Sequence, residues 1–355
     1  MGTFGTVVIT LLVFGLLIFI HEFGHYITAR IFKVTINEFS IGMGPRLFSY
    51  VSKKSGIRYS IAAIPIGGFV AMAGEDGDSG EPLVSDDPNS FDRKPAWQRF
   101  IITFAGAFVN VVAGIIAMIV LTSMIKIGNT TVVQFADPSE TGYEISSEKS
   151  GLREGDVITR VDGKRVRILD ELSYEIMRKG YEPVDITVIR DGEEMVLPDV
   201  AFPTISDQGQ SFGAMDFKVR AVDKDFFQVM KYSWCKSTLI IRMCWESLYD
   251  LITGRYTFAA VSGPVGMSSA IGEAASDGPA TLLYIVALIS INLGVMNLLP
   301  IPALDGGRLI TIVIEMITRK RLPPKIEGII NAVGLTLLLA FSFFIMIKDI
   351  IQLII

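Results

Sequence analysis

The sequence predicts a polytopic α-helical membrane protein with four transmembrane helices, a membrane re-entrant β-hairpin and an inserted soluble α+β domain. Half of the 355 residues are hydrophobic and the mean hydropathy is +0.47, well above the range of soluble globular proteins. Four separate apolar segments interrupt more polar sequence, and one long polar segment with strand and turn signals lies between the second and the third. These observations together predict the fold class.

Each apolar segment approaches the length of about 20 residues that a helix needs to cross the hydrocarbon core of a bilayer. We expect spans at residues 4–30, 98–127, 280–300 and 328–352. The first segment lacks the basic start and the Ala-x-Ala pattern of a cleaved signal peptide, so we expect it to stay in the mature protein.

Basic residues flank the spans unevenly. They follow the first span, precede the second, and separate the third from the fourth. Because cytoplasmic loops carry an excess of Lys and Arg, both of these loops are expected in the cytoplasm. The long segment between the second and third spans then lies outside the cytoplasm, with both chain ends.

The first cytoplasmic loop contains β-type sequence at residues 56–74. Two short runs, Arg58 to Ala62 and Gly68 to Met72, are separated by Pro65 and glycines, which predicts a hairpin and not a fifth helix. Apolar strands of this kind reach membrane depth only where protein covers their backbone.

The outer segment contains a domain large enough to fold alone. We expect a strand at Val157 to Val161, a helix at Leu169 to Lys179, and a hairpin of Val184 to Arg190 with Glu193 to Leu197. Phe226 to Leu251 has the aromatic and basic residues of an interfacial helix, but a helix packed on the soluble domain fits equally well. The chain thus divides into 1–127, 128–205, 206–278 and 279–355.

Composition excludes several classes of function. The net charge of −5 comes without a concentrated basic patch, so nucleic acid is not an expected partner. Cys235 and Cys244 are too few for a disulfide framework or a thiolate zinc cluster. The chain has two histidines, His21 and His25, so every histidine-dependent site must use this pair.

The segment His21-Glu22-Phe23-Gly24-His25 ends the first apolar helix. Residues four apart share one helix face, so the two imidazoles can bind one metal ion with Glu22 beside it. Imidazole nitrogen suits Zn2+, and a catalytic zinc site has three protein ligands and an open position. A charge at the centre of a membrane helix costs roughly 2.5 to 3.5 kcal/mol, which favours a functional role for these residues.

The third ligand should be a carboxylate, because no histidine remains. Asp305 lies in the motif from Asn297 to Gly307, where Pro300 and Pro302 break the helix. Gly306 and Gly307 are expected to leave room for a metal or a substrate. The alternative role for Asp305 is to cap the helix that follows it.

These motifs resemble the site-2 protease family. The resemblance rests on the segments His21 to His25 and Asn297 to Gly307, a PDZ-like domain between the second and third spans, Ser262 to Gly266, and Gly106 to Asn110. It covers essentially the whole chain. This chain has room for a single PDZ-like domain, whereas some relatives carry two.

The resemblance implies specific roles. His21, His25 and Asp305 would bind zinc, with Glu22 as the catalytic base and the 56–74 hairpin as the re-entrant element. Asn297 and Pro300 would position the substrate, and Asn110 would either contact the substrate or join two helices by a hydrogen bond. These roles describe a zinc metalloprotease.

The same resemblance implies a setting. The chain would be a multi-pass protein of the bacterial inner membrane, embedded in its lipid bilayer, with the active site near the cytoplasmic side. Substrates would be single-span membrane proteins, such as anti-sigma factors or signal-peptide remnants, after an upstream site-1-type protease has cut them. The PDZ-like domain would bind a substrate tail or exclude bulky proteins.

Three alternatives remain open. A membrane scaffold could work through the PDZ-like domain with a structural metal site, although such sites normally have four protein ligands. A metal transporter should carry polar residues on several spans. An aspartyl intramembrane protease needs two Asp at membrane depth, and Asp305 alone is well placed.

Overall fold

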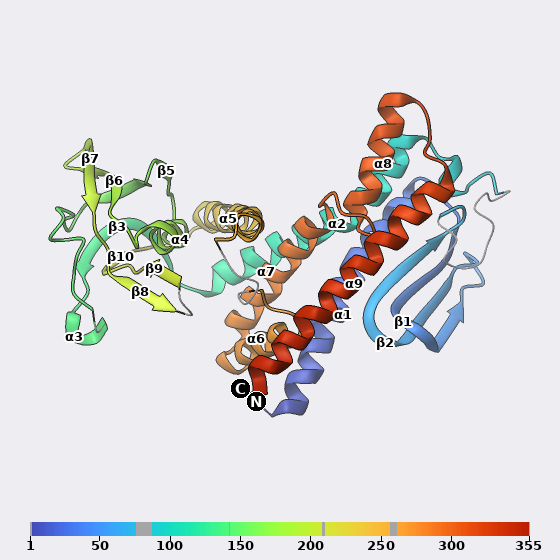
Figure 1. Ribbon diagram of the computed structural model, residues 1–355, viewed down its shortest axis with the longest axis horizontal. Helices are drawn as coiled ribbons and strands as arrows, with labels where there is room; N and C mark the ends of the chain where they lie inside the picture. Colours follow the sequence, from blue (N-terminus) through green and yellow to red (C-terminus); the bar gives the residue numbers. More distant parts are fainter. Residues whose placement is uncertain (1, 76–86, 142, 208–209, 256–260, 355) are drawn as a thin grey trace. The chain divides into compact units, whose positions relative to one another are not determined.

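The computed structural model describes residues 2–75, 87–141, 143–207, 210–255 and 261–354 (Figure 1). The chain forms two compact units. One comprises Met1–Ala117 with Ile240–Ile355 and is called the helical unit here; the other, Met118–Leu239, is called the sheet unit. Each unit is described by itself.

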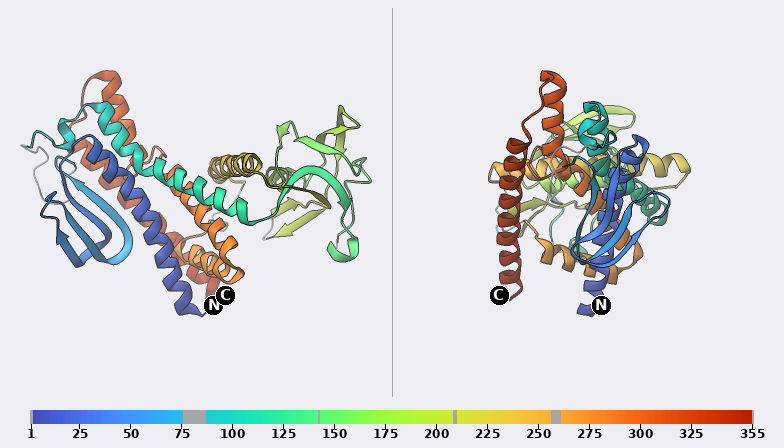
Figure 2. Two further views of the ribbon diagram at one scale, coloured as in Figure 1. Left: turned by 180° about the vertical axis from the view of Figure 1, so that it is seen from behind. Right: turned by 90° about the vertical axis from the view of Figure 1, so that its right-hand side faces the viewer.

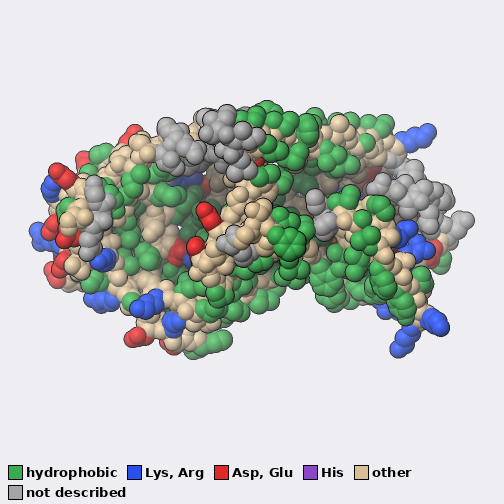
Figure 3. Space-filling model, turned by 90° about the horizontal axis from the view of Figure 1, so that it is seen from below, with side chains coloured by type: hydrophobic (Ala, Val, Ile, Leu, Met, Phe, Trp, Pro, Cys, Tyr) green, Lys and Arg blue, Asp and Glu red, His purple; other side chains and the backbone are tan. Residues whose placement is uncertain are grey.

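Four helices are long and apolar enough to cross a membrane. They are α1 (Thr3–Ile31), α2 (Ala96–Met124), α7 (Pro279–Asn297) and α9 (Pro324–Ile354). The four predicted spans are therefore confirmed as helices of suitable length and composition. Large apolar side chains stay exposed on them, such as Leu337 and Phe343 at 65% and 59%, and hydrophobic side chains cover much of the surface in Figure 3. Such a surface suits lipid contact.

Glycines bring the membrane helices close together. A Cβ built on Gly24 of α1 would lie 2.5 Å from the carbonyl oxygen of Ala105 in α2. Further along α2, a Cβ on Gly114 would lie 2.5 Å from Ile291 Cγ1 of α7. Small residues at helix crossings allow this close packing in membranes. The crossing at Gly24 lies inside the His21 to His25 motif.

Two shorter helices complete the helical unit. The helix α6 (Pro264–Asp277) begins after Gly263, whose backbone N–H donates to Asp349 Oδ2 of α9 at 2.9 Å. The N–H of Gly266 donates to the same oxygen at 3.1 Å. Asp349 thus satisfies two N–H groups at the start of α6. The helix α8 (Asp305–Thr318) follows the proline-containing break after α7.

A two-stranded sheet packs on α1 within the helical unit, as Figures 1 and 2 both show. Its strands are β1 (Ile36–Val51) and β2 (Arg58–Met72), which pair antiparallel from Ile36 with Met72 to Met43 with Ile64, and again from Arg46 with Ala62 to Val51 with Arg58. Phe39 and Val70 are buried in a core that includes Ala29 of α1 and Ile102 of α2. A 3-10 turn, η1 (Phe91–Arg93), leads from this region to α2.

The expected pairing within residues 56–74 is wrong. The runs 58–62 and 68–72 do not pair with each other, because each pairs with β1. The sequence did not predict the strand β1, because its pattern includes the charged residue Glu38. Glu38 is buried and accepts hydrogen bonds from Arg46 Nε at 2.9 Å and from Ser60 Oγ at 2.6 Å. A buried carboxylate with such partners is compatible with a strand.

The sheet unit is built around strands in the order β10-β3-β4-β6-β7, with β5 beside β4. Its elements are β3 (Ile127–Phe135), α3 (Pro138–Thr141), β4 (Val157–Val161), β5 (Lys164–Arg165), α4 (Leu169–Lys179), β6 (Val184–Arg190), β7 (Glu193–Val200), the hairpin β8 (Thr204–Asp207) with β9 (Gln210–Gly213), and β10 (Phe217–Val222). The predicted strand β4, helix α4 and hairpin β6-β7 are confirmed. Because β10 pairs with β3, the sheet extends past the expected boundary at residue 205.

The helix α5 (Phe226–Ile252) confirms the predicted helix after the soluble domain. Within the sheet unit, its Tyr232 and Cys235 are buried against Ile127 and Ile168. Its first half is therefore packed on the soluble domain, one of the two alternatives considered. Trp234 remains 57% exposed on this half, and contact of α5 with the membrane interface stays a prediction.

Candidate metal centre

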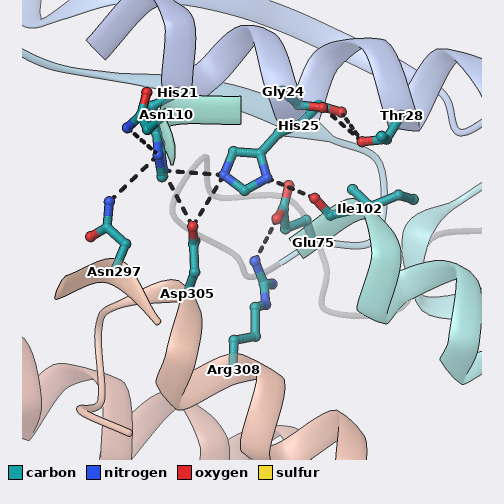
Figure 4. A network of polar contacts seen from close by, with 10 residues as sticks. All are labelled: His21, Gly24, His25, Thr28, Glu75, Ile102, Asn110, Asn297, Asp305 and Arg308. Atoms are coloured by element: carbon teal, nitrogen blue, oxygen red, sulfur yellow. Dashed lines mark hydrogen bonds and ion pairs between the residues drawn. The ribbon is translucent and has the colours of Figure 1, made fainter. Parts of the chain in front are cut away.

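Three side chains from two helices converge on one point, as Figure 4 shows. Nε2 of His21 and Nε2 of His25 lie 3.2 and 3.4 Å from Oδ2 of Asp305. The two Nε2 atoms are 3.3 Å apart. The side chains are between 12% and 20% exposed, so this polar cluster is largely shielded from solvent. The structure thus brings together the three predicted ligands.

The backbone of α2 fixes His25. Its Nδ1 lies 2.8 Å from the carbonyl oxygen of Ile102, which can accept the Nδ1 proton and direct Nε2 towards Asp305. Gly106, one turn later on α2, makes this approach possible. A Cβ on Gly106 would lie 2.2 Å from His25 Nε2. In the sequence, Gly106 stands out only as part of the segment from Gly106 to Asn110 that resembles the family. The resemblance does not say what this glycine does.

Asp305 is the first residue of α8 and not its cap. Leu304 is the N-cap, and among the described residues no side chain forms a capping hydrogen bond there. The expectation that Gly306 and Gly307 leave room for metal or substrate needs correction. A Cβ on Gly306 would lie 2.0 Å from Leu299 O, and one on Gly307 2.5 Å from Ile301 O. These glycines therefore let the start of α8 pack on the preceding loop.

The three ligand atoms fit a zinc ion. Metal–ligand lengths of about 2.0 to 2.1 Å imply edges of about 3.3 Å in a tetrahedral site, and the observed separations are 3.2 to 3.4 Å. Asp305 Oδ2 is buried and, among the described residues, its polar neighbours are the two imidazole nitrogens at 3.2 and 3.4 Å, neither of which forms a regular hydrogen bond with it. A cation bound between Asp305 Oδ2 and the two imidazole nitrogens would give all three atoms a common partner. Among the residues that the structure describes, no other His, Cys, Asp or Glu completes the set to four ligands.

Glu22 borders a cavity of about 960 Å³ that reaches the cluster. The strand residues Gly68 to Met72 form part of its wall. A Cβ on Gly68 would lie 3.0 Å from Glu22 Cγ, so the backbone of β2 passes directly beside Glu22. The cavity therefore joins the predicted base, the three ligands and a strand, and it has room for a peptide segment.

The remaining predicted site residues, Asn110, Asn297 and Pro300, lie outside the cavity. Nδ2 of Asn110 and Nδ2 of Asn297 lie 3.2 and 3.5 Å from Nδ1 of His21. Pro300 is exposed in the loop after α7. None of the three is among the described residues that line the cavity. A substrate contact for Asn297 or Pro300 stays a prediction.

An ion pair beside the centre was not foreseen. Arg308, one turn after Asp305 on α8, donates to Glu75 at 2.5 Å. Glu75 follows β2 and also accepts the N–H of Met72 at 3.3 Å. The Arg308 guanidinium lies over the ring of Phe91, 5.2 Å from its centroid. This pair connects the helix of a ligand with the strand that lines the cavity.

Comparison with known proteins identifies related chains. A model of peptidase family M50 matches residues 9–341. Three curated proteins named "putative zinc metalloprotease" align over nearly their whole length: one from Clostridium acetobutylicum is 31% identical, covering 98% of both chains. One from Clostridium perfringens is 33% identical over 97% of this chain and 98% of its own. One from Fusobacterium nucleatum is 32% identical with the same coverage.

Proposed function

The chain belongs to peptidase family M50 and is a zinc metalloprotease, and on this premise we propose that it cuts other membrane proteins within or beside their transmembrane segments. The observation that carries the proposal is the position of the centre. Two ligands lie on α1, a 29-residue helix that is long and apolar enough to cross a membrane. A site on such a helix is accessible to a peptide bond at membrane depth.

The chain's own residues supply the proton transfers. Zinc, when bound, polarises the scissile carbonyl and acidifies a water molecule. Glu22 follows His21 directly and borders the cavity, so it is placed to take the proton from the attacking water. The same carboxyl then delivers the proton to the leaving amide nitrogen.

The strand β2 is proposed to hold the substrate. A peptide bond in an intact helix is shielded, so the substrate segment must be extended before it is cut. Residues 64–72 pair with β1 on one side, and 68–72 line the cavity. An extended peptide can add to such a strand through backbone hydrogen bonds. Leu47 and Phe48 are 72% and 62% exposed, which suits the proposal that this sheet enters the membrane.

The sheet unit is proposed to be a PDZ-like domain outside the cytoplasm. Its helix α4 packs against β3 and β4, and a partner could be a substrate tail or a bulky domain that must be excluded. In this proposal the chain is in the bacterial inner membrane and acts on single-span proteins after an upstream protease. A scaffold with a structural metal site is less well supported, because the centre has three ligands and borders a large cavity.

The test uses purified protein in liposomes with a single-span substrate. Glu22→Gln should keep its zinc and its fold yet lose cleavage, because the amide cannot take a proton from water. Glu154→Gln, on an exposed turn of the sheet unit, is the matched control and should cleave normally. Cleavage by Glu22→Gln at the wild-type rate would remove Glu22 from the mechanism.

A further inference from the structure

Asn110 of α2 lies behind the ring of His21, opposite the point where the ligands converge (Figure 4). Its Nδ2 is 3.2 Å from His21 Nδ1. The residue is 0% exposed, and within the part of the chain that the structure describes its buried Oδ1 has no hydrogen-bond partner. A fully buried amide with an unpartnered oxygen, in contact with a ligand ring, requires an explanation.

The chemistry of imidazole supplies one. Nε2 of His21 faces Asp305 and His25, so the lone pair that binds a metal is on Nε2. A neutral imidazole with this lone pair free carries its proton on Nδ1. The Nδ1–H group then needs an acceptor, and such an acceptor fixes both the tautomer and the ring orientation.

A half-turn of the Asn110 amide supplies that acceptor. With Nδ2 towards His21, two N–H groups would face each other once Nδ1 carries its proton. The half-turn exchanges the two ends of the amide and places Oδ1 at the Nδ1–H group. We propose that Asn110 Oδ1 accepts the Nδ1 proton of His21 and so holds this ring in the form that binds the metal. This inference rests on the metal centre of the proposed function.

The geometry of α1 and α2 agrees with this role. His25 uses the Ile102 carbonyl for its Nδ1 at 2.8 Å, so α2 would provide the acceptor for both ligand rings. The two helices run antiparallel, so His21 lies beside Asn110, and His25, one turn later on α1, lies beside Ile102, an earlier residue of α2. Asn110 is itself held in place, because its backbone oxygen accepts a hydrogen bond from Ser290 of α7 at 2.8 Å.

Asn297 is the competing acceptor. Its Nδ2 lies 3.5 Å from the same Nδ1, at the limit of a hydrogen bond, and the residue is the last of α7 and half-buried. Asn110 is closer and fully buried, so it acts through His21 and does not touch a substrate in the cavity. Asn297 remains available for the substrate role that the family resemblance implies.

The experiment measures zinc affinity by competition with a chelator. Purified protein carries Glu22→Gln throughout, so that the readout is independent of proteolysis. Asn110→Leu should weaken zinc binding 10- to 100-fold, the usual range for the loss of an outer hydrogen bond to a ligand histidine. Asn110→Asp keeps an acceptor and should restore binding to within a few-fold of wild type, a rescue that a purely packing role would not give. Asn297→Leu removes the competing acceptor and should change zinc affinity much less than Asn110→Leu does, while Glu154→Gln on the exposed turn of the sheet unit is the neutral control.

Two results would overturn the inference. One is wild-type zinc affinity in Asn110→Leu; the other is a loss in Asn297→Leu without one in Asn110→Leu. If Asn110→Leu does not fold, the smaller Asn110→Ala is measured in its place with the same expected loss. Because no cleavage is measured, failure here is distinct from failure of the proposed function, which the Glu22→Gln cleavage assay tests.

Discussion

Gly106 lies directly against the imidazole of His25. A Cβ at this position would be 2.2 Å from Nε2 and 2.6 Å from Cε1. The Ile102 carbonyl already holds this ring through Nδ1, so moving the ring away from a methyl group at position 106 would disturb that hydrogen bond. The absence of a side chain on α2 is therefore a condition for the metal centre.

Gly106→Ala should reduce zinc affinity at least tenfold, because the methyl group displaces the ligand nitrogen of His25. Alanine otherwise favours a helix by about 1 kcal/mol over glycine, so the secondary structure should persist. Zinc competition and circular dichroism measure both effects.

Gly114→Ala is the control for that change. It lies on the same helix, and its Cβ would lie 2.5 Å from Ile291 Cγ1, so it disturbs packing away from the ligands. Equal zinc losses in the two variants would contradict a specific role for Gly106.

The pair of Glu75 and Arg308 should stabilise the cavity wall. Each side chain is about one-fifth exposed, and hydrogen bonds between charged groups contribute about 1.5 to 3 kcal/mol. Glu75→Gln and Arg308→Met should each lower thermal stability and cleavage. In a double-mutant cycle the double variant should lose less than the sum of the single losses. Strictly additive losses would show that the two side chains do not interact.

Asp349 should stabilise the start of α6. Asp349→Ala leaves the N–H groups of Gly263 and Gly266 without their acceptor, at an expected cost of about 1 kcal/mol in the free energy of unfolding. Asp349→Asn retains an acceptor oxygen and should recover most of the loss. Denaturant titration in detergent compares the three proteins, and an unchanged midpoint for Asp349→Ala would refute the role.

Tyr232 should make the sheet unit sensitive to high pH. Its burial raises the pKa of the phenol above the ordinary value of 10.0, and the neighbouring Asp170 raises it further. A raised folded-state pKa means that the folded state favours the neutral phenol. The stabilisation is complete below pH 10 and decreases as the pH rises above it. Wild type should therefore lose more thermal stability than Tyr232→Phe on raising the pH from 9 to about 11; parallel losses would contradict this.

The sequence predicted the ligands because their chemistry leaves few choices. His21 and His25 are the only histidines, and Asp305 is a carboxylate in a broken helix after an apolar span. A different kind of signal predicted the four spans, the hairpin β6-β7 and the helix α4: the length of apolar runs, turn residues and local periodicity. Local signals sufficed for these elements.

The missed features depend on contacts between distant segments. In the sequence, Glu38 has the character of a surface residue; in the structure, Arg46 and Ser60 donate hydrogen bonds to it. The strand β1 was not predicted for this reason. The reason for a glycine at position 106 is evident only from the structure, in which the His25 ring lies against it. Hydrogen bonds and close contacts of this kind have no period along the chain, so no sequence pattern indicates them.

The central claim is that His21, His25 and Asp305 bind one zinc ion, and zinc content tests it most directly. Elemental analysis of purified protein should find about one zinc per chain in wild type and in Glu22→Gln, whose altered residue is not a ligand. Asp305→Ala should lose most of its zinc after mild chelation because the site then has two ligands. Full zinc occupancy in Asp305→Ala after the same treatment would contradict the account.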